Sequence, residues 1–130
     1  SAWIEFGRSY NQSNVIQATS ANLGATGIVT VTGRGPSVVI RVDAAASSAG
    51  VLRRAVGGEQ GQLLHVTASA GSDALIIVGS DAADTFIATS TTSAVQFRLA
   101  SSGVVSFVRI ADKWREIRPI WSNSTIGISQ

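Results

Sequence analysis

The 130-residue sequence contains no cysteine and no methionine, only two prolines, and few charged residues. Without cysteine, the chain has neither a disulfide framework nor a thiolate metal site. Charged residues make up 14% of the sequence, below the roughly 25% that is usual in soluble domains, whereas apolar residues make up 45%. Because a small domain buries only a modest fraction of its surface by itself, this composition favours an oligomer that buries much of each subunit.

Long apolar runs and concentrated charge are absent as well. No run of about 18 apolar residues occurs, which excludes a transmembrane helix. The net charge is +2, and the cationic residues are dispersed apart from Arg53-Arg54 and a group between residues 109 and 118. Nucleic-acid binding favours a continuous basic face. We therefore expect no nucleic-acid partner and no insertion into a membrane. The chain begins with Ser1 instead of Met: either the initiator is removed before the small Ser1 or, as we favour, this is a piece of a longer chain.

Short β-branched runs separated by Gly, Ser and Asp predict strands. Ile28–Thr32 and Val38–Val42 flank the turn-forming segment Gly33–Ser37, which predicts a hairpin. Val104–Ile110 is the longest apolar run, and after a turn at Asp112-Lys113 the chain returns as its partner. No segment has a 3.6-residue apolar period over 11 or more residues, so the pattern favours an all-β fold.

The predicted organisation is one domain of short antiparallel strands over residues 28–118. Residues 1–27 are polar apart from a few aromatic and aliphatic side chains, and we expect an N-terminal extension or joining segment there. Residues 119–130 form a C-terminal tail. In the run from residue 95 to residue 99, apolar and polar residues alternate, which turns the apolar ones inward. The residues expected to form the core or pack a trimer are Trp114, Phe107, Val104, Val95, Phe97 and Leu99.

We predict no catalytic residue, no cofactor and no metal site. The only histidine, His65, would need a carboxylate or a nucleophile brought to it by the fold, and no local motif supplies one. A packed or interface histidine is the favoured interpretation, although a Ser-His-Asp arrangement stays open. Asp73, Asp81 and Asp84 do not have the spacing of a calcium loop and are interpreted as turn residues. The glycine-rich segments 33–36 and 57–61 lack a P-loop lysine and predict turns.

The aromatic residues are the sharper candidates for binding. An indole ring stacks on the C–H groups of a sugar while its N–H donates to a hydroxyl. Trp114 is favoured as a core residue beside Val105 and Phe107, because it stands in the strand that closes the last hairpin. The candidate receptor or partner contacts are Trp121, Arg118, Trp3 and Tyr10.

Two motifs carry a resemblance to a known class of domains. Gly57-Gly58-Glu59-Gln60-Gly61-Gln62 leads into an apolar strand, and Trp114-Arg115-Glu116-Ile117 closes the last hairpin. This order, over roughly residues 36–118, resembles the strand-rich domains of bacteriophage tail fibres, tailspikes and head fibres. The resemblance implies a β-prism or sandwich-like domain in an intertwined or closely packed homotrimer. It also implies a non-catalytic role at the surface of a virion or phage-like particle.

The partner implied by the resemblance is a host cell-surface glycan, most commonly a polysaccharide, or another virion structural protein. Two alternatives stay open from the sequence. One is a purely structural module that trimerises a fibre or attaches it to the particle, with the segment from Trp3 to Tyr10 as a docking arm. The other is a bacterial carbohydrate-binding domain of the lectin kind, which would act as a monomer.

Overall fold

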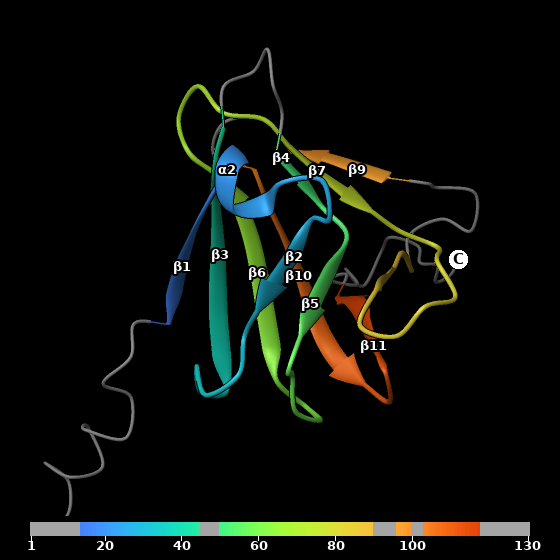
Figure 1. Cartoon of the computed structure of the whole chain (residues 1–130). Helices are drawn as coiled ribbons and strands as arrows, with labels where there is room; N and C mark the ends of the chain where they lie inside the picture. Colours follow the sequence, from blue (N-terminus) through green and yellow to red (C-terminus); the bar gives the residue numbers. More distant parts are fainter. Residues whose placement is uncertain (1–13, 45–49, 90–95, 100–102, 118–130) are drawn as a thin grey trace, which may run out of the picture.

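The structure is a computed structural model that describes residues 14–44, 50–89, 96–99 and 103–117. It is nearly all-β, as the sequence predicts, with one four-residue helix among the described residues. Figure 1 shows the elements, which are β1 (Val15–Thr19), α2 (Ser20–Leu23), β2 (Ile28–Thr30), β3 (Ser37–Asp43), β4 (Gly50–Leu52), β5 (Arg54–Val56), β6 (Leu63–Ala68), β7 (Ala74–Ile77), β8 (Phe86–Ile87), β9 (Gln96–Leu99), β10 (Val104–Ile110) and β11 (Lys113–Ile117). None of the described helices is long and apolar enough to cross a membrane.

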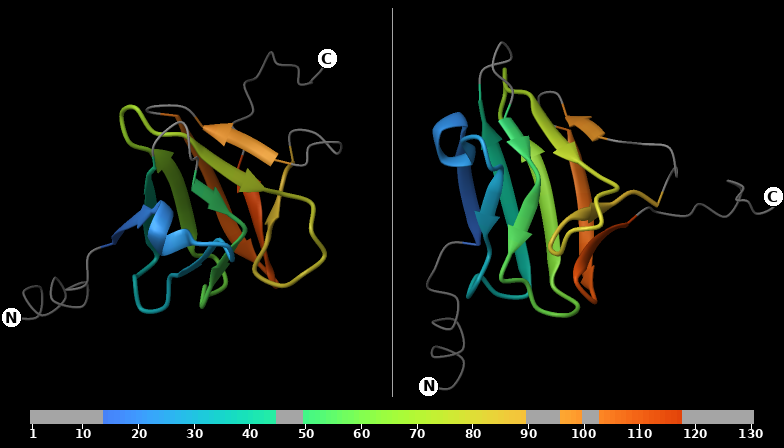
Figure 2. Two further views of the ribbon diagram at one scale, coloured as in Figure 1. Left: turned by 45° about the horizontal axis from the view of Figure 1, so that its top comes forward. Right: turned by 45° about the vertical axis from the view of Figure 1, so that its right-hand side comes forward.

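The chain winds into a short solenoid-like coil in which equivalent strands of successive turns stack in parallel. β1, β3 and β6 lie side by side in a six-stranded sheet of order β1-β3-β6-β10-β11-β8. β5 stacks on β2, and β7 stacks on β4, also in parallel. The strands of these two smaller sheets lie on one side of the six-stranded sheet (Figures 1 and 2).

The last part of the chain closes the coil with antiparallel strands. β9 pairs with β7, and β10 pairs with β6. β10 and β11 form the predicted hairpin, in which Ile110 is opposite Lys113. The turn therefore consists of Ala111 and Asp112, one residue earlier than expected, and Ala111 adopts a φ of 57°.

The expected antiparallel hairpin between residues 28–32 and 38–42 is wrong. β2 pairs with β5, and β3 pairs with β1 and β6, all in parallel. The glycines of the intervening segment form a corner of the coil, with φ values of 74° at Gly33 and 94° at Gly35. A turn sequence shows where a strand ends, but it does not determine whether the next strand pairs with the previous one.

The ordered domain also begins earlier than residue 28. β1 pairs along its whole length with β3, and Ala18 is buried. The helix α2 follows directly, capped by Thr19: its hydroxyl accepts from the N–H of Asn22 at 3.1 Å, and the Asn22 side chain accepts from the N–H of Thr19 at 3.2 Å. This reciprocal cap holds a helix of one turn, whose Leu23 is buried in the core.

The core lies between the six-stranded sheet and the two smaller sheets. Aligned positions on neighbouring strands stack inside the coil, for example Val38, Leu64 and Phe107. The ring centroids of Phe107 and Phe86 are 4.8 Å apart. Trp114 is fully buried, as predicted, and its indole N–H donates to the carbonyl oxygen of Ala55 at 2.8 Å. This bond satisfies the polar group that burial of an indole leaves without water.

Candidate functional site

The feature that stands out is the side of the six-stranded sheet that faces away from the core. Side chains alternate between the two faces of a strand, so the register places every second residue of each strand on this side. We call it the outer sheet face. It consists of Val15, Gln17, Thr19, Ser37, Val39, Arg41, Asp43, Leu63, His65, Thr67, Ile87, Val104, Ser106, Val108, Ile110, Lys113, Arg115 and Ile117.

The exposed large apolar side chains of the described residues gather on the outer sheet face, among polar ones. The exposed large hydrophobic side chains among the described residues are Val104 (61% exposed), Ile110 (47%), Val15 (40%) and Ile117 (40%), and all four lie on it. Between them, Val39, Leu63 and Val108 are half-buried. A contiguous exposed apolar surface of this kind marks an interaction site, whereas isolated exposed hydrophobic residues are ordinary.

A histidine–serine pair lies in the middle of this face. Nδ1 of His65 is 2.8 Å from Oγ of Ser106, and the two residues are directly opposite each other on β6 and β10. The row they share continues to Val39 on one side and Ile117 on the other. The two polar side chains therefore satisfy each other inside an apolar row, which lowers the cost of covering it.

The same pair is the place where catalysis would have to be sought. Acyl transfer by a serine requires a base that is itself oriented by a third group, most often a carboxylate. In the described part of the chain no carboxylate contacts His65. Likewise, no cluster of three or more His, Cys, Asp or Glu side chains that could hold a metal occurs among the described residues. Among the described residues His65 is therefore packed against Ser106, with no third group to orient it.

Cationic side chains lie among the apolar ones on this face. Arg41 on β3 and Arg115 on β11 are exposed there, and neither forms an ion pair with a described residue. Lys113, at the hairpin end, reaches away to the carbonyl oxygen of Asp81 at 3.2 Å. The carboxylate of Asp43, at the end of β3, is the only one on this side among the described residues of the six strands. The face therefore combines exposed apolar side chains with an excess of positive charge.

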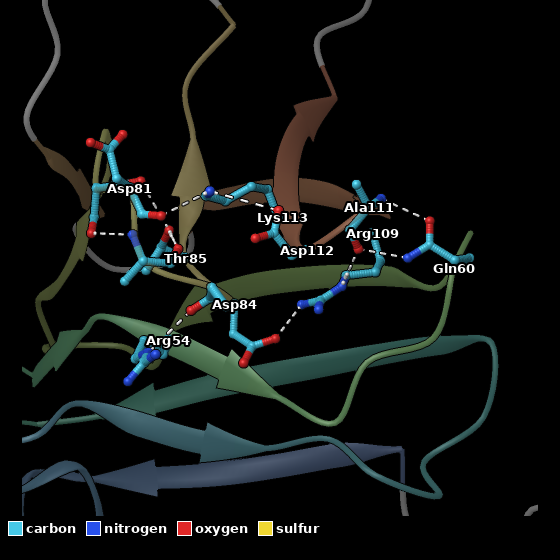
Figure 3. A network of polar contacts seen from close by, with 12 residues as sticks. Arg54, Gln60, Asp81, Asp84, Thr85, Arg109, Ala111, Asp112 and Lys113 are labelled. Atoms are coloured by element: carbon cyan, nitrogen blue, oxygen red, sulfur yellow. Dashed lines mark hydrogen bonds and ion pairs between the residues drawn. The ribbon is translucent and has the colours of Figure 1, made fainter.

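The predicted turn aspartates stabilise the fold through ion pairs and turns (Figure 3). Asp84 pairs with Arg109 at 2.7 Å, and Asp73 pairs with Arg98. In the turn before β8, the hydroxyl of Thr85 donates to the carbonyl oxygen of Ala82 at 2.6 Å and of Ser80 at 3.2 Å. These carboxylates therefore have structural partners.

A hollow of about 350 Å³ lies where two successive corners of the coil meet. It is lined by Gly33, Gly35, Pro36, Gly57, Glu59, Gln60, Gly61 and Gln62. Its two glutamine side chains are already engaged, because Gln62 donates to the carbonyl oxygen of Gly35 at 2.7 Å and Gln60 binds both backbone groups of Ala111. The glycine segments form turns, as the sequence predicts, and the hollow does not gather a free set of polar side chains.

The predicted site and core residues fall into three groups. Trp114 and Phe107 are fully buried, and Phe97 and Leu99 are partly buried against the core. Val104 instead points outward, because Val105 and Phe107 occupy the inward positions of β10. The others lie outside the described residues: Trp3, Tyr10, Val95, Arg118 and Trp121.

The sequence analysis missed the outer sheet face as a surface. One signal was available: the run Val104–Ile110 is apolar at both alternating sets of positions, which is typical of a strand covered on both sides. The aliphatic residues of β1, β3 and β11 that complete the face come from distant parts of the sequence.

Comparison of the chain with protein-family models, with curated proteins and with solved structures found no significant match.

Proposed function

We propose that this chain is a non-catalytic structural and adhesion domain of a fibre or spike on a phage-like particle, and that it works as a homotrimer. The observation that carries the proposal is the outer sheet face, on which all the exposed large hydrophobic side chains of the described residues gather. In a trimer this face turns toward the neighbouring copies. The low charge content and the phage-fibre resemblance of the two motifs support the same assignment.

The coil suits such a role mechanically. Parallel stacking of successive turns builds a rigid rod from nearest-neighbour contacts, and its length grows with the number of turns. Bundling rods through an apolar face gives a stiff appendage without any metal or disulfide. The adhesive function itself, recognition of a host cell-surface polysaccharide, is assigned to Trp121 and Arg118, and contact with a partner chain is assigned to Trp3 and Tyr10.

A purely structural trimerisation or attachment module is the second candidate, and one observation favours it. The aromatic side chains of the described residues are Phe86, Phe97, Phe107 and Trp114, and all of them are buried or packed against the core. The described surface therefore offers no ring on which a sugar would stack. In this alternative the partner is another virion structural protein.

A charge placed on the outer sheet face tests the proposal. We expect Val104→Lys to convert the trimer into a monomer, because a lysine would be desolvated in the apolar contact. Thr30→Lys is the matched control, since Thr30 is exposed on β2, away from this face, and should leave the trimer intact. Light scattering gives the mass of each variant, and circular dichroism verifies its folding. A folded Val104→Lys protein that is still a trimer would contradict the assignment of this face.

A further inference from the structure

We propose that the outer sheet face is covered by the N-terminal segment, residues 1–13, of a second copy of the chain, so that the copies exchange arms. This inference rests on the proposed function, because it assumes that the chain self-associates through this face. It identifies the part of the neighbouring copy that makes the contact.

The face is small, so an arm would enlarge the contact that it makes. Six strands at about 4.8 Å spacing, each with about five residues at about 3.3 Å rise, give a flat outline of roughly 24 by 17 Å. A stable interface buries about 800 Å² of accessible surface on each partner. An extended arm that lies across a neighbouring face adds its own buried surface to the contribution of each copy.

The chemistry of residues 1–13 fits an aliphatic surface. The sequence has eight aromatic residues, of which four belong to the described core. Three of the other four, Trp3, Phe6 and Tyr10, fall within the first ten residues, together with Ile4. Large aromatic side chains contribute the most apolar area per residue to an interface. The outer sheet face has aliphatic side chains and no aromatic ring among its described residues, so the two surfaces complement each other.

Charge argues against direct packing of two such faces. Arg41 and Arg115 lie on the face without an ion-pair partner among the described residues. The arm adds one acidic and one basic side chain, Glu5 and Arg8, so its own charge is balanced. Two faces packed directly on each other would instead bring arginines of both copies together.

The position of Asn14 favours exchange between copies over folding back. Its carbonyl oxygen accepts from the N–H of Val39 at 2.8 Å, which fixes the chain where β1 begins at the edge of the sheet (Figure 1). β1 runs away from this point along β3. In our proposal the arm continues outward from this edge of the sheet, since an arm on its own face would have to reverse direction there. Thirteen extended residues span up to about 45 Å, which is enough to cross a neighbouring face.

Disulfide trapping tests the exchange, and the absence of native cysteine removes any background. Ala2→Cys, Gly7→Cys and Ser9→Cys are each combined with Val104→Cys in the full chain and oxidised. We expect at least one pair to give covalently linked dimers and trimers on a non-reducing gel. The matched control replaces Val104→Cys by Thr30→Cys, which is exposed on β2, and should give no linkage.

The outcomes separate this inference from the proposed function. If all three pairs stay unlinked, or close within one chain, while light scattering shows a trimer, the arm exchange is wrong and the proposed assembly stands. The same holds if Ser124→Cys links to Val104→Cys and the N-terminal pairs do not, since the C-terminal segment would then cover the face. A monomer in light scattering contradicts both.

Discussion

The guanidinium of Arg109 lies 2.7 Å from the carboxylate of Asp84 and 5.5 Å from the ring of Trp114. Both charged side chains are largely removed from solvent, with 10% and 22% of their side-chain surfaces exposed. The backbone of Asp84 also links distant parts of the coil, because its N–H donates to Asp112 at 2.7 Å and its carbonyl oxygen accepts from Ala55 at 3.1 Å. The Arg109–Asp84 pair therefore ties β10 to the segment before β8, and the backbone of Asp84 links that segment to β5 (Figure 3).

We predict that Asp84→Asn destabilises the protein by about 3 kcal/mol, because it leaves the shielded guanidinium of Arg109 without its counter-charge. Asparagine tolerates the positive φ of 66° at this position, so the variant removes the charge without adding backbone strain. Urea unfolding at a fixed chain concentration measures the loss. The control is Asp112→Asn, whose exposed pair with Lys113 is 3.7 Å long and should contribute less than about 1 kcal/mol. Equal effects of the two variants would remove the case for a locking pair.

The packing of Trp114 against Gly58 gives a second prediction. A Cβ built on Gly58 would lie 2.5 Å from Cζ2 of the Trp114 ring, so Gly58→Ala should force this buried ring out of position. Trp114→Ala should cost about 3–5 kcal/mol through the cavity it leaves. The control for both variants is Ala70→Gly or Ala82→Gly, which changes a small side chain at an exposed loop position instead of in the core. Thermal unfolding checks both, and a Gly58→Ala protein as stable as the wild type would show that the ring has room to move.

Removal of divalent metal should leave stability unchanged. The carboxylates of Asp73 and Asp84 are bound to Arg98 and Arg109, and an arginine partner and a metal ion would compete for the same oxygens. We therefore expect the melting temperature in EDTA to equal that in calcium. A drop of more than several degrees would mean that these aspartates, or Asp81, hold a cation.

Trp121 and Trp114 should respond differently to substitution if the domain is adhesive. Trp121→Ala is expected to weaken binding to host cells or glycans while the melting temperature of the trimer stays within a few degrees. Trp114 has an assigned structural role, because it is fully buried and bonded to Ala55. Full binding by a folded Trp121→Ala trimer would contradict the assignment of Trp121 as a contact residue.

Local patterns in the sequence predicted the parts of the fold that depend on neighbouring residues. The alternation at Phe97 and Leu99 correctly placed both against the core, and the turn after Ile110 correctly predicted the last hairpin. The stacking of Val15 on Val39 and of Val39 on His65 was not predictable, because the stacked residues differ in type and no exact repeat marks the coil. Val104 was expected either to form the core or to pack a trimer, and the structure places it on the exposed side of β10. The sequence left that choice open, because a shift of one residue reverses the face of every side chain in a strand and an apolar run such as Val104-Val105 fits either face.

The mass of the unmodified chain in solution tests the central claim most directly. The outer sheet face and its proposed covering arm require self-association, and three chains of 13.4 kDa give a trimer of about 40 kDa. Light scattering at micromolar chain concentration should find this mass across a dilution series. A monomer of 13.4 kDa that stays folded under the same conditions would contradict the account.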